Sequence, residues 1–448
     1  MGQPLSGIRI VEMGQLIAIP FATKLLADMG AEVIRIESCS RLEEYRTYSL
    51  YDNDATGEYW NRAANFYEQN RNKFGITLDL ETDKGIGLLK DIISISDVFA
   101  QNFTPRVVKK FGLEYESLSQ IKPDIIMVSS TGYGHTGPWS QFGAIGYGTE
   151  AASGLTHMTG YECGPPVLPQ IPHADFTAAE HTVFAIMTSL IHRASTGAGQ
   201  FIDISQTETL SATIPEAMMD YSINGATKGR MGNQHSEMSP HGCYPCKGND
   251  RWIAISIEND EEWINLCSVL GNPKLAIEPR FSNANNRHIH RKELDQLLTN
   301  STSLRDQYEL MKELQENKVP AGAVVNGKQL LFDPHLKARG FFETISHHVT
   351  TGIPTLPYPS RPWKMSKSKV MGSNPAPIMG EHNEQVICSL LGNTNEHLKS
   401  LENEGVVGYK PINPQSNTIP LEIQKRKGQI IEYDQNFRDE IHEHFGDL

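Results

Sequence analysis

Short apolar runs alternate with segments of helical periodicity over the first 130 residues, and this alternation limits the chain to few folds. Parallel strands need long crossover connections, which are usually helices, and successive strand-helix-strand units build one parallel sheet. The pattern therefore predicts an α/β protein with a doubly wound parallel sheet. Strands are expected at Ile8–Met13, Ala31–Glu37, Asp97–Phe103 and Asp124–Ser130, and helices at Pro20–Met29 and Lys84–Ser94.

The pattern changes further along the chain. A long helix is predicted over Phe176–Arg193, because the stop signal Thr-Gly-Ala-Gly follows at 196–199. Residues 225–250 are rich in Gly, Pro, Ser and His and indicate a hinge. A smaller α+β domain is expected beyond this hinge, with a strand at Trp252–Ile257 and helices near 260–270 and 304–316.

The composition is that of a globular protein and argues against several classes of function. The 448 residues include 53 acidic and 40 basic side chains, which gives a net charge of −13. This charge, without a long block of Lys or Arg, argues against nucleic acid or an anionic membrane as a partner. No apolar run reaches the ~18–20 residues that span a bilayer, and the N-terminus lacks a secretory pattern. We expect a cytoplasmic protein.

Six cysteines are too few for a disulfide scaffold in a chain of this length. Cys243 and Cys246 form one C-x-x-C, with His235 and His241 nearby, so a redox pair or half of a zinc site is one interpretation. However, no second C-x-x-C completes a tetrahedral site, and the motif leads into a strand instead of a helix. We favour a structural or coincidental pair and expect no metal site.

Polar residues follow the predicted strands. Gln15 follows the first strand, and Asn102 and Phe103 follow the third. The carboxyl ends of the strands in a doubly wound sheet form a ligand crevice. Neither the glycine pattern of a dinucleotide-binding turn nor a G-x-x-x-x-G-K-S/T phosphate loop is present. These residues predict an α/β enzyme with a crevice at this edge, without identifying its ligand.

Asp175 stands just before the long apolar helix and has two interpretations. As a helix N-cap, it is typical of a helix start, with Glu180 soon after it. As a nucleophile, a carboxylate that faces a crevice is ionised at neutral pH and can attack an activated acyl group. The residue pattern by itself leaves both interpretations open.

Several motifs occur together in a fixed order along the chain. They are Leu5–Glu12, Leu25–Glu37, Asn70–Leu80, Asp97–Pro105, Thr196–Ser205, Val319–Val324, Asp333–Gly340 and Gly380–Asn383. In these motifs, from about residue 3 to about residue 408, the sequence resembles the class III CoA-transferases, the formyl-CoA and carnitine CoA-transferase family. The resemblance implies an enzyme that moves CoA from an acyl-CoA donor, such as succinyl-CoA, to a carboxylic acid. It also implies that CoA is a substrate and that no cofactor is tightly bound.

The resemblance assigns roles to individual residues. The family's catalytic aspartate falls on Asp175, which would form aspartyl anhydride and aspartyl-CoA thioester intermediates. Gly232 and Gly242 would lie on a small-domain loop that closes over the intermediate. The CoA-binding positions fall on Ala18, Leu78, Asn102, Phe103 and Lys110.

Departures from the family pattern predict an apolar substrate pocket. Apolar residues replace the polar or small ones that members with small substrates carry after the first strand and in the loop before Ala151. An apolar pocket favours a bulky or aromatic acceptor, such as that of a benzylsuccinate CoA-transferase subunit, over one the size of formate. The pocket positions are Ile17, Ile19, Ile145, Gly146 and Gly242.

Two alternatives to an active CoA-transferase remain. Ser38 replaces an arginine that usually follows the second strand, although Arg35 and Arg41 flank it. A partly degenerate subunit that supports an active homologue is therefore one alternative. An acyl-CoA racemase is the other, and it is disfavoured because Ile145 occupies the position of that enzyme's catalytic histidine.

The resemblance also implies an architecture. Family members have a Rossmann-like large domain and interlock in pairs, so we expect a homodimer or a heterodimer with a homologous subunit. The expected ranges are 1–210 for the N-terminal part of the large domain, 211–330 for the linker and small domain, 331–405 for the C-terminal part of the large domain, and 406–448 for an extended tail.

Overall fold

The computed structural model describes residues 3–368 and 374–446, so parts of the predicted large domain (1–2, 369–373) and tail (447–448) lie outside the described residues. The chain divides into two compact units. The first comprises Met1–Leu155, Pro169–Met218 and Gly340–Leu448, and the second comprises Thr156–Leu168 and Met219–Arg339. The short segment Thr156–Leu168, which the predicted ranges assign to the large domain, thus belongs to the second unit.

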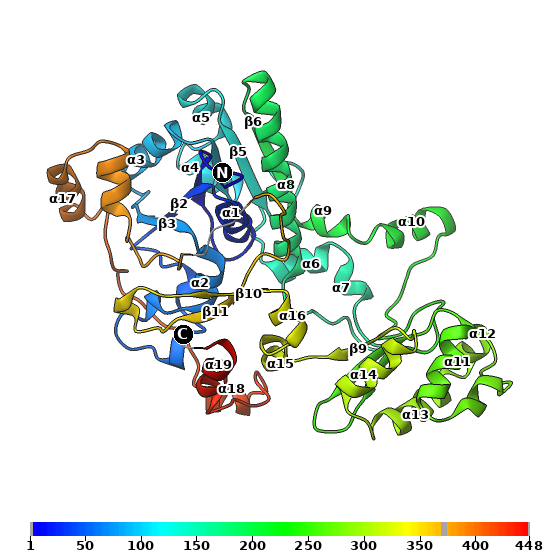
Figure 1. The fold of residues 1–448 in the computed structure, drawn as a ribbon. Helices are drawn as coiled ribbons and strands as arrows, with labels where there is room; N and C mark the ends of the chain where they lie inside the picture. The colour runs from blue at the N-terminus through cyan, green and yellow to red at the C-terminus, as the bar shows by residue number, and fades with distance from the viewer. Residues whose placement is uncertain (1–2, 369–373, 447–448) are drawn as a thin grey trace. The chain divides into compact units, whose positions relative to one another are not determined.

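The first unit is built on a six-stranded sheet in the order β3-β2-β1-β4-β5-β6, in which all neighbouring strands are parallel (Figure 1). This is the strand order of a doubly wound fold, and the predicted α/β class is confirmed. The strands at the two edges, β3 and β6, were not predicted from the sequence. The strands are β1 Arg9–Met13, β2 Glu32–Glu37, β3 Lys73–Thr77, β4 Val98–Gln101, β5 Ile126–Thr131 and β6 Gln200–Ser205.

Helices cover both faces of this sheet, because successive residues of each strand point to opposite sides. Ile10 and Val33 pack with α1 and α8 in one apolar core. Val11 and Ile34 pack in another core with α3, α5 and residues 386–407. The helices of the first unit up to β6 are α1 Ala18–Asp28, α2 Ala64–Asn70, α3 Asp83–Ser94, α4 Pro105–Lys110, α5 Tyr115–Ile121, α6 Gly146–Ala152 and α8 His173–Thr196.

Helix α8 starts earlier than predicted, at His173, and its N-cap position is occupied by Pro172. Asp175 therefore lies inside the first turn, and the interpretation of this residue as the N-cap is wrong. The helix ends as expected, because Gly197 adopts a left-handed conformation with φ of 74°. Neither α8 nor any other helix in the described part of the chain combines the length and apolarity that crossing a membrane requires.

The second unit has its own small antiparallel sheet, in the order β7-β8-β9. Trp263, Phe281 and Leu310 belong to an apolar core between this sheet and the surrounding helices. Cys243 is exposed and Cys246 is buried, and both are free thiols. The elements are β7 His241–Pro245, β8 Trp252–Ser256, α11 Asp260–Val269, α12 Ala284–Ile289, α13 Arg291–Thr302, α14 Gln307–Glu316, β9 Ala321–Val324, α15 Gly327–Leu331 and α16 Pro334–Ala338.

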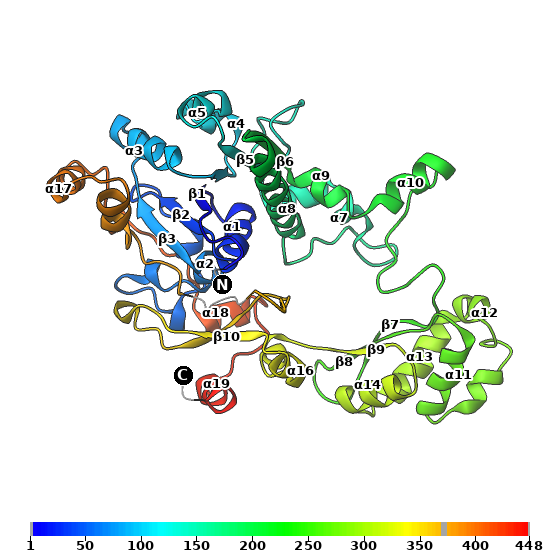
Figure 2. The ribbon, with the colours of Figure 1, turned by 45° about the horizontal axis from the view of Figure 1, so that its top comes forward.

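The last hundred residues return to the first unit (Figure 2). The tail is not extended as predicted, because it contains two short helices, α18 and α19, and hydrogen-bonds to residues near the start of the chain. The remaining elements are α7 Leu155–Met158, α9 Gln206–Ser211, α10 Pro215–Asn224, β10 Phe342–Ile345, β11 Leu356–Pro359, a π-helix at Gln385–Leu390, α17 Asn395–Asn403, α18 Leu421–Arg426 and α19 Phe437–Phe445.

Candidate active site

The strand order reverses between β1 and β4, and the loops that leave these two strands are joined there. Asn102 follows β4, and its side-chain oxygen Oδ1 accepts a hydrogen bond from the backbone N–H of Gln15 at 2.9 Å. Its amide Nδ2 donates to the carbonyl oxygen of Gln15 at 2.8 Å. Asn102 thus fixes both polar groups of one residue in the loop after β1, at the crevice expected for a doubly wound sheet.

A second side chain, that of Glu43, also holds the loop after β1. Leu16 has a left-handed φ of 59°, which is costly for a residue with a branched side chain. Its backbone N–H donates to Glu43 at 2.9 Å, and the other oxygen of Glu43 accepts from Arg35 at 2.9 Å. Burial raises the pKa of Glu43, while the charge of Arg35 opposes this shift. Glu43 therefore stabilises the unusual backbone at Leu16.

Arg35 belongs to a network of charges buried within the first unit. Glu12, fully buried, pairs with both Arg35 and Lys73, and its carboxylate lies 2.7 Å from the Lys73 ammonium. Burial lowers the pKa of Lys73 to about 7, although the charge of Glu12 opposes this shift. Arg35, one of the two arginines that flank Ser38, is therefore paired with the internal carboxylates of Glu12 and Glu43.

Asp175 lies at the wall of a cavity of about 550 Å³ in the first unit and is 8% exposed. Its Oδ1 atom accepts a hydrogen bond from Gln206 at 3.3 Å, and the backbone N–H of Ala18 also donates to the carboxylate. Gly146 passes so close that a Cβ atom there would lie 2.1 Å from Oδ2. The lining includes Gln15, Leu16, Ile17, Tyr45, Tyr48, Asn65, Asn102, Phe103, Phe142, Ile145, Gly146, Tyr147, Asp175 and Gln206.

The pKa of Asp175 is raised to about 6. Burial is the main cause, and the charge of Glu150 acts in the same direction, whereas the donors on Gln206 and Ala18 lower the pKa. At pH 7 the carboxylate is still roughly nine-tenths ionised. It is thus an anion with little solvation, which is the state required of a carboxylate nucleophile.

We expect kcat/KM to fall on the acid side of the Asp175 pKa, because the protonated carboxyl cannot attack an acyl group. Initial rates measured from about pH 4.5 to pH 8 should give a plateau at high pH and a unit slope below about pH 6. Thermal unfolding at each pH serves as the control for loss of folded enzyme. A profile that stays flat down to pH 4.5 would contradict this expectation.

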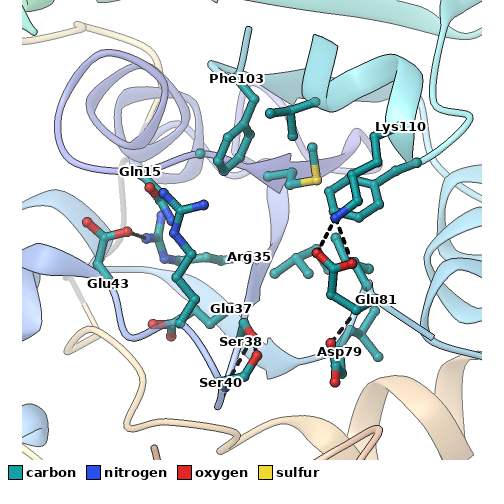
Figure 3. A pocket seen from close by; sticks show the side chains of 18 residues that line it. Gln15, Arg35, Glu37, Ser38, Ser40, Glu43, Asp79, Glu81, Phe103 and Lys110 are labelled. Carbon is teal, nitrogen blue, oxygen red and sulfur yellow. Dashed lines mark hydrogen bonds and ion pairs between the residues drawn. The ribbon is translucent and has the colours of Figure 1, made fainter. Parts of the chain in front are cut away.

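A second cavity, of about 200 Å³, adjoins the first (Figure 3). Gln15 and Phe103 line both cavities. Leu78 lines the second, and so does Lys110, whose ammonium is directed at the Glu81 carboxylate, 2.6 Å away. Ser38, Ser40 and Arg41 also line it. Four predicted CoA positions (Leu78, Asn102, Phe103 and Lys110) are thus gathered around two cavities that share lining residues.

The structure does not bring every predicted residue to these cavities. Ala18 contributes through its backbone N–H, because its side chain is buried at the start of α1. Ile19 is fully buried in the core with Ile10 and Leu26. Gly232 and Gly242 line a separate cavity of about 360 Å³ within the second unit.

Several residues of the Asp175 cavity were not predicted from the sequence. Gln206 directly follows β6, so the rule that polar residues after strand ends line the crevice would have found it, had β6 been predicted. Tyr45 and Tyr48 lie in an irregular segment without periodicity. Burial raises the pKa of Tyr48 to about 12. Burial also raises the pKa of Tyr45, and the negative charge of Asp175 adds to that second shift. Both phenols therefore remain protonated donors beside the carboxylate.

Comparison with known proteins identifies the family. The model of CoA-transferase family III matches residues 5–383. This chain belongs to that family. A succinate–glutarate CoA-transferase of Agrobacterium fabrum is 33% identical over 388 residues, 86% of this chain and 96% of the relative. A succinyl-CoA–D-citramalate CoA-transferase of Chloroflexus aurantiacus is 30% identical over 408 residues, 90% of this chain and 98% of the relative.

A solved structure agrees with this assignment. The CAIB/BAIF family protein of Brucella suis superposes on this class III CoA-transferase with a TM-score of 0.79 and 31% identity, over 87% of this chain and all of the other. Among the described residues of this CoA-transferase, no group of three or more His, Cys, Asp or Glu side chains is arranged to hold a metal ion.

Proposed function

We propose that this CoA-transferase moves CoA from succinyl-CoA to a second carboxylic acid, with Asp175 as the covalent nucleophile. The observation that carries the proposal is the state of Asp175, an anion with a raised pKa that two N–H donors hold at the wall of a cavity. The relatives named above act, by their names, on succinate or succinyl-CoA and on a five-carbon diacid. A donor thioester and an acceptor carboxylate would both need to reach this one side chain.

The reaction follows from that nucleophile. The Asp175 carboxylate attacks the thioester carbonyl, the C–S bond breaks, and a mixed anhydride and the CoA thiolate form. The thiolate attacks the aspartyl carbonyl, which releases succinate and leaves an aspartyl-CoA thioester. The acceptor carboxylate attacks that thioester, the C–S bond breaks, and a second mixed anhydride and the CoA thiolate form. The thiolate then attacks the acceptor's acyl carbon, which gives the new acyl-CoA and frees the Asp175 carboxylate. Asp175 and the two substrates supply every electron pair, so the sequence requires no further cofactor.

The two cavities suit the two parts of this chemistry. We assign the CoA nucleotide to the cavity lined by Leu78, Arg41 and Lys110, where cations can meet phosphate groups. Phe103 and Gln15, shared by both cavities, would then flank the pantetheine arm on its way to Asp175. Glu81 would have to yield Lys110 to the ligand, which is feasible because exposed ion pairs contribute only about 0–1 kcal/mol.

We further propose that the acceptor is larger than a two-carbon acid and is a branched or aromatic dicarboxylate. Ile17 and Ile145 line the Asp175 cavity, and Tyr45, Tyr48 and Phe142 add aromatic surface. Burial of an apolar group contributes about 25 cal/mol per Å², and aromatic pairs add to this. Ile19, which is in the core, no longer supports the argument.

A specificity comparison tests this function. With succinyl-CoA as donor, we expect kcat/KM for benzylsuccinate, citramalate and glutarate to exceed that for oxalate at least about tenfold. Transfer to glutarate tenfold better than to benzylsuccinate would contradict the bulky acceptor and leave the transferase intact. A preference for oxalate, or no transfer to any of the four acids, would contradict the proposal itself.

Asp175 and its surroundings favour an active enzyme over a degenerate supporting subunit. The carboxylate keeps both of its donors, and Asn102 keeps both of its hydrogen bonds to the loop after β1. Ser38, which replaces the arginine usual in the family, lines the proposed CoA cavity together with Arg41. We therefore place CoA binding and chemistry in this chain.

We also propose that the chain pairs with a second copy or with a homologous subunit. Phe184 and Ile191 lie two turns apart on one face of α8 and are 73% and 70% exposed. Sedimentation should therefore show a species of twice the chain mass at micromolar concentration. The double variant Phe184→Asp/Ile191→Asp should shift it toward the monomer, and a wild-type chain that sediments as a monomer would contradict the proposal.

A further inference from the structure

The segment that carries Tyr45 and Tyr48 has little regular structure of its own. It consists of short 3-10 turns, Glu44–Arg46 and Tyr51–Asn53, and Ser49, Asp52 and Asn53 all have positive φ angles between 54° and 55°. Backbone of this kind is costly for residues other than glycine, so contacts outside the segment must stabilise it. The segment also forms one wall of the Asp175 cavity through its two tyrosines.

The C-terminal tail supplies several of those contacts, and they converge on Thr47. The backbone N–H of Asn417 donates to the Thr47 carbonyl oxygen at 2.8 Å, and the Asn417 side chain donates to the Thr47 hydroxyl at 3.0 Å. The hydroxyl of Ser416 donates to the same carbonyl at 3.2 Å. Thr47 is buried and is next to Tyr48 in sequence, so these bonds fix the backbone that sets the direction of the Tyr48 ring.

Two further contacts extend this attachment along the segment. The side chain of Asn53 donates to the carbonyl oxygen of Ile419 at 3.1 Å. Arg438 of α19 pairs with Asp52 and lies over the ring of Tyr51, 5.5 Å from its centroid. The tail (red in Figure 1) therefore contacts the segment at four of its residues. The match to the family model ends at residue 383, so this tail lies beyond the matched region.

We infer that tail residues 416–419 clamp the segment 44–53 and thereby position Tyr45 and Tyr48 for the acceptor acid. Asn417 is a positioning residue that acts through Thr47. The inference rests on the proposed function, because it assigns the two phenol O–H groups to the acceptor's second carboxylate. Tyr45 lies close enough to Asp175 to feel its charge, and its ring packs edge-on against Tyr48 at 5.5 Å between centroids. Release of the clamp should therefore affect the acceptor and spare CoA, whose proposed cavity does not include these tyrosines.

The test compares three variants of the full-length chain. Asn417→Ala removes the side-chain donor, and Asn417→Pro also removes the backbone N–H that reaches Thr47. Asn436→Ala is the matched control, because Asn436 makes no side-chain cap bond at the start of α19. We expect KM for the best acceptor to rise about tenfold in Asn417→Pro and about threefold in Asn417→Ala, the size expected for loss of one or two hydrogen bonds. The Kd for free CoA, which carries no acid group for the tyrosines, should stay within about twofold in all three.

Hydrogen exchange separates the clamp from the proposed function. Peptides that cover residues 44–53 should exchange faster in Asn417→Pro than in the wild type. Their exchange rate should be unchanged in Asn436→Ala. Faster exchange with an unchanged acceptor KM would overturn the positioning role, and unchanged exchange in both Asn417 variants would overturn the clamp. An equal weakening of acceptor binding and of free CoA binding would also overturn the inference. A wild-type chain without transferase activity would instead contradict the proposed function, whatever the exchange result.

Discussion

Replacement of Asp175 by alanine should lower kcat for CoA transfer at least about a thousandfold, because Asp175 is the buried carboxylate that Gln206 and the backbone of Ala18 hold at the cavity wall. Glu44, the other carboxylate in the lining, is exposed and solvated. The neighbouring Glu150 is fully buried and is not among the residues that line the cavity. Transfer from succinyl-CoA to the best acceptor, followed by chromatography of the CoA esters, gives the measurement. Hydroxylamine should modify the wild-type enzyme at Asp175 during turnover, and peptide mass spectrometry should detect this modification.

Two further variants make this result interpretable. Asp175→Asn should be as inactive as the alanine variant but more stable than wild type at pH 8. Burial raises the folded-state pKa from 3.8 to about 6, so ionisation above that pH costs folding free energy that an amide does not cost. Glu216→Ala, at an exposed acidic residue on α10, should keep full activity. Near-wild-type turnover of Asp175→Ala would rule out the covalent route.

Replacement of Glu12 by alanine should destabilise the first unit by about 3–5 kcal/mol, because the change leaves Arg35 and Lys73 buried without their shared anion. For a protein of this size, such a loss lowers the melting temperature by roughly 5 °C. Thermal unfolding followed by circular dichroism measures the shift.

An exposed ion pair provides the control for this prediction. Glu81 pairs with Lys110, and both side chains are more than half exposed. Glu81→Ala should therefore change the free energy of unfolding by less than about 1 kcal/mol. Equal shifts for Glu12→Ala and Glu81→Ala would mean that the buried network contributes no more than an exposed pair.

The fold was predictable wherever burial leaves a pattern in the sequence. The four central strands are buried along almost their whole length, and each contains a core of Val, Ile, Met, Phe or Ala that the sequence pattern reveals. The two edge strands were not predicted because their apolar patterns are interrupted. Lys73 and Gly75 interrupt β3, and in β6 the alternate residues Phe201 and Asp203 are exposed. The start of α8 was misplaced for a related reason, since its first turn is polar and the periodicity begins only at Phe176.

The site was predictable in so far as local sequence determines it. Asn102 and Phe103 follow a strand end, and family resemblance pointed to Asp175. Tyr45 and Tyr48 left no such signal, because the segment that presents them is fixed by hydrogen bonds to residues about 370 positions later in the chain. Ile19 failed as a pocket residue because it follows Ile17, which lines the cavity, by two positions, about half a helical turn, and so lies on the side of α1 that packs into the core.

The contact between Gly146 and Asp175 offers a way to sort paralogues from their genes alone. A single methyl group at position 146 would lie 2.1 Å from Oδ2 of Asp175, so any codon other than glycine would obstruct the proposed nucleophile. A paralogue that only supports a partner is released from this restriction and can accumulate substitutions there without cost. Glycine at position 146 together with aspartate at position 175 therefore indicates a catalytic paralogue. A larger residue at position 146 indicates a supporting paralogue.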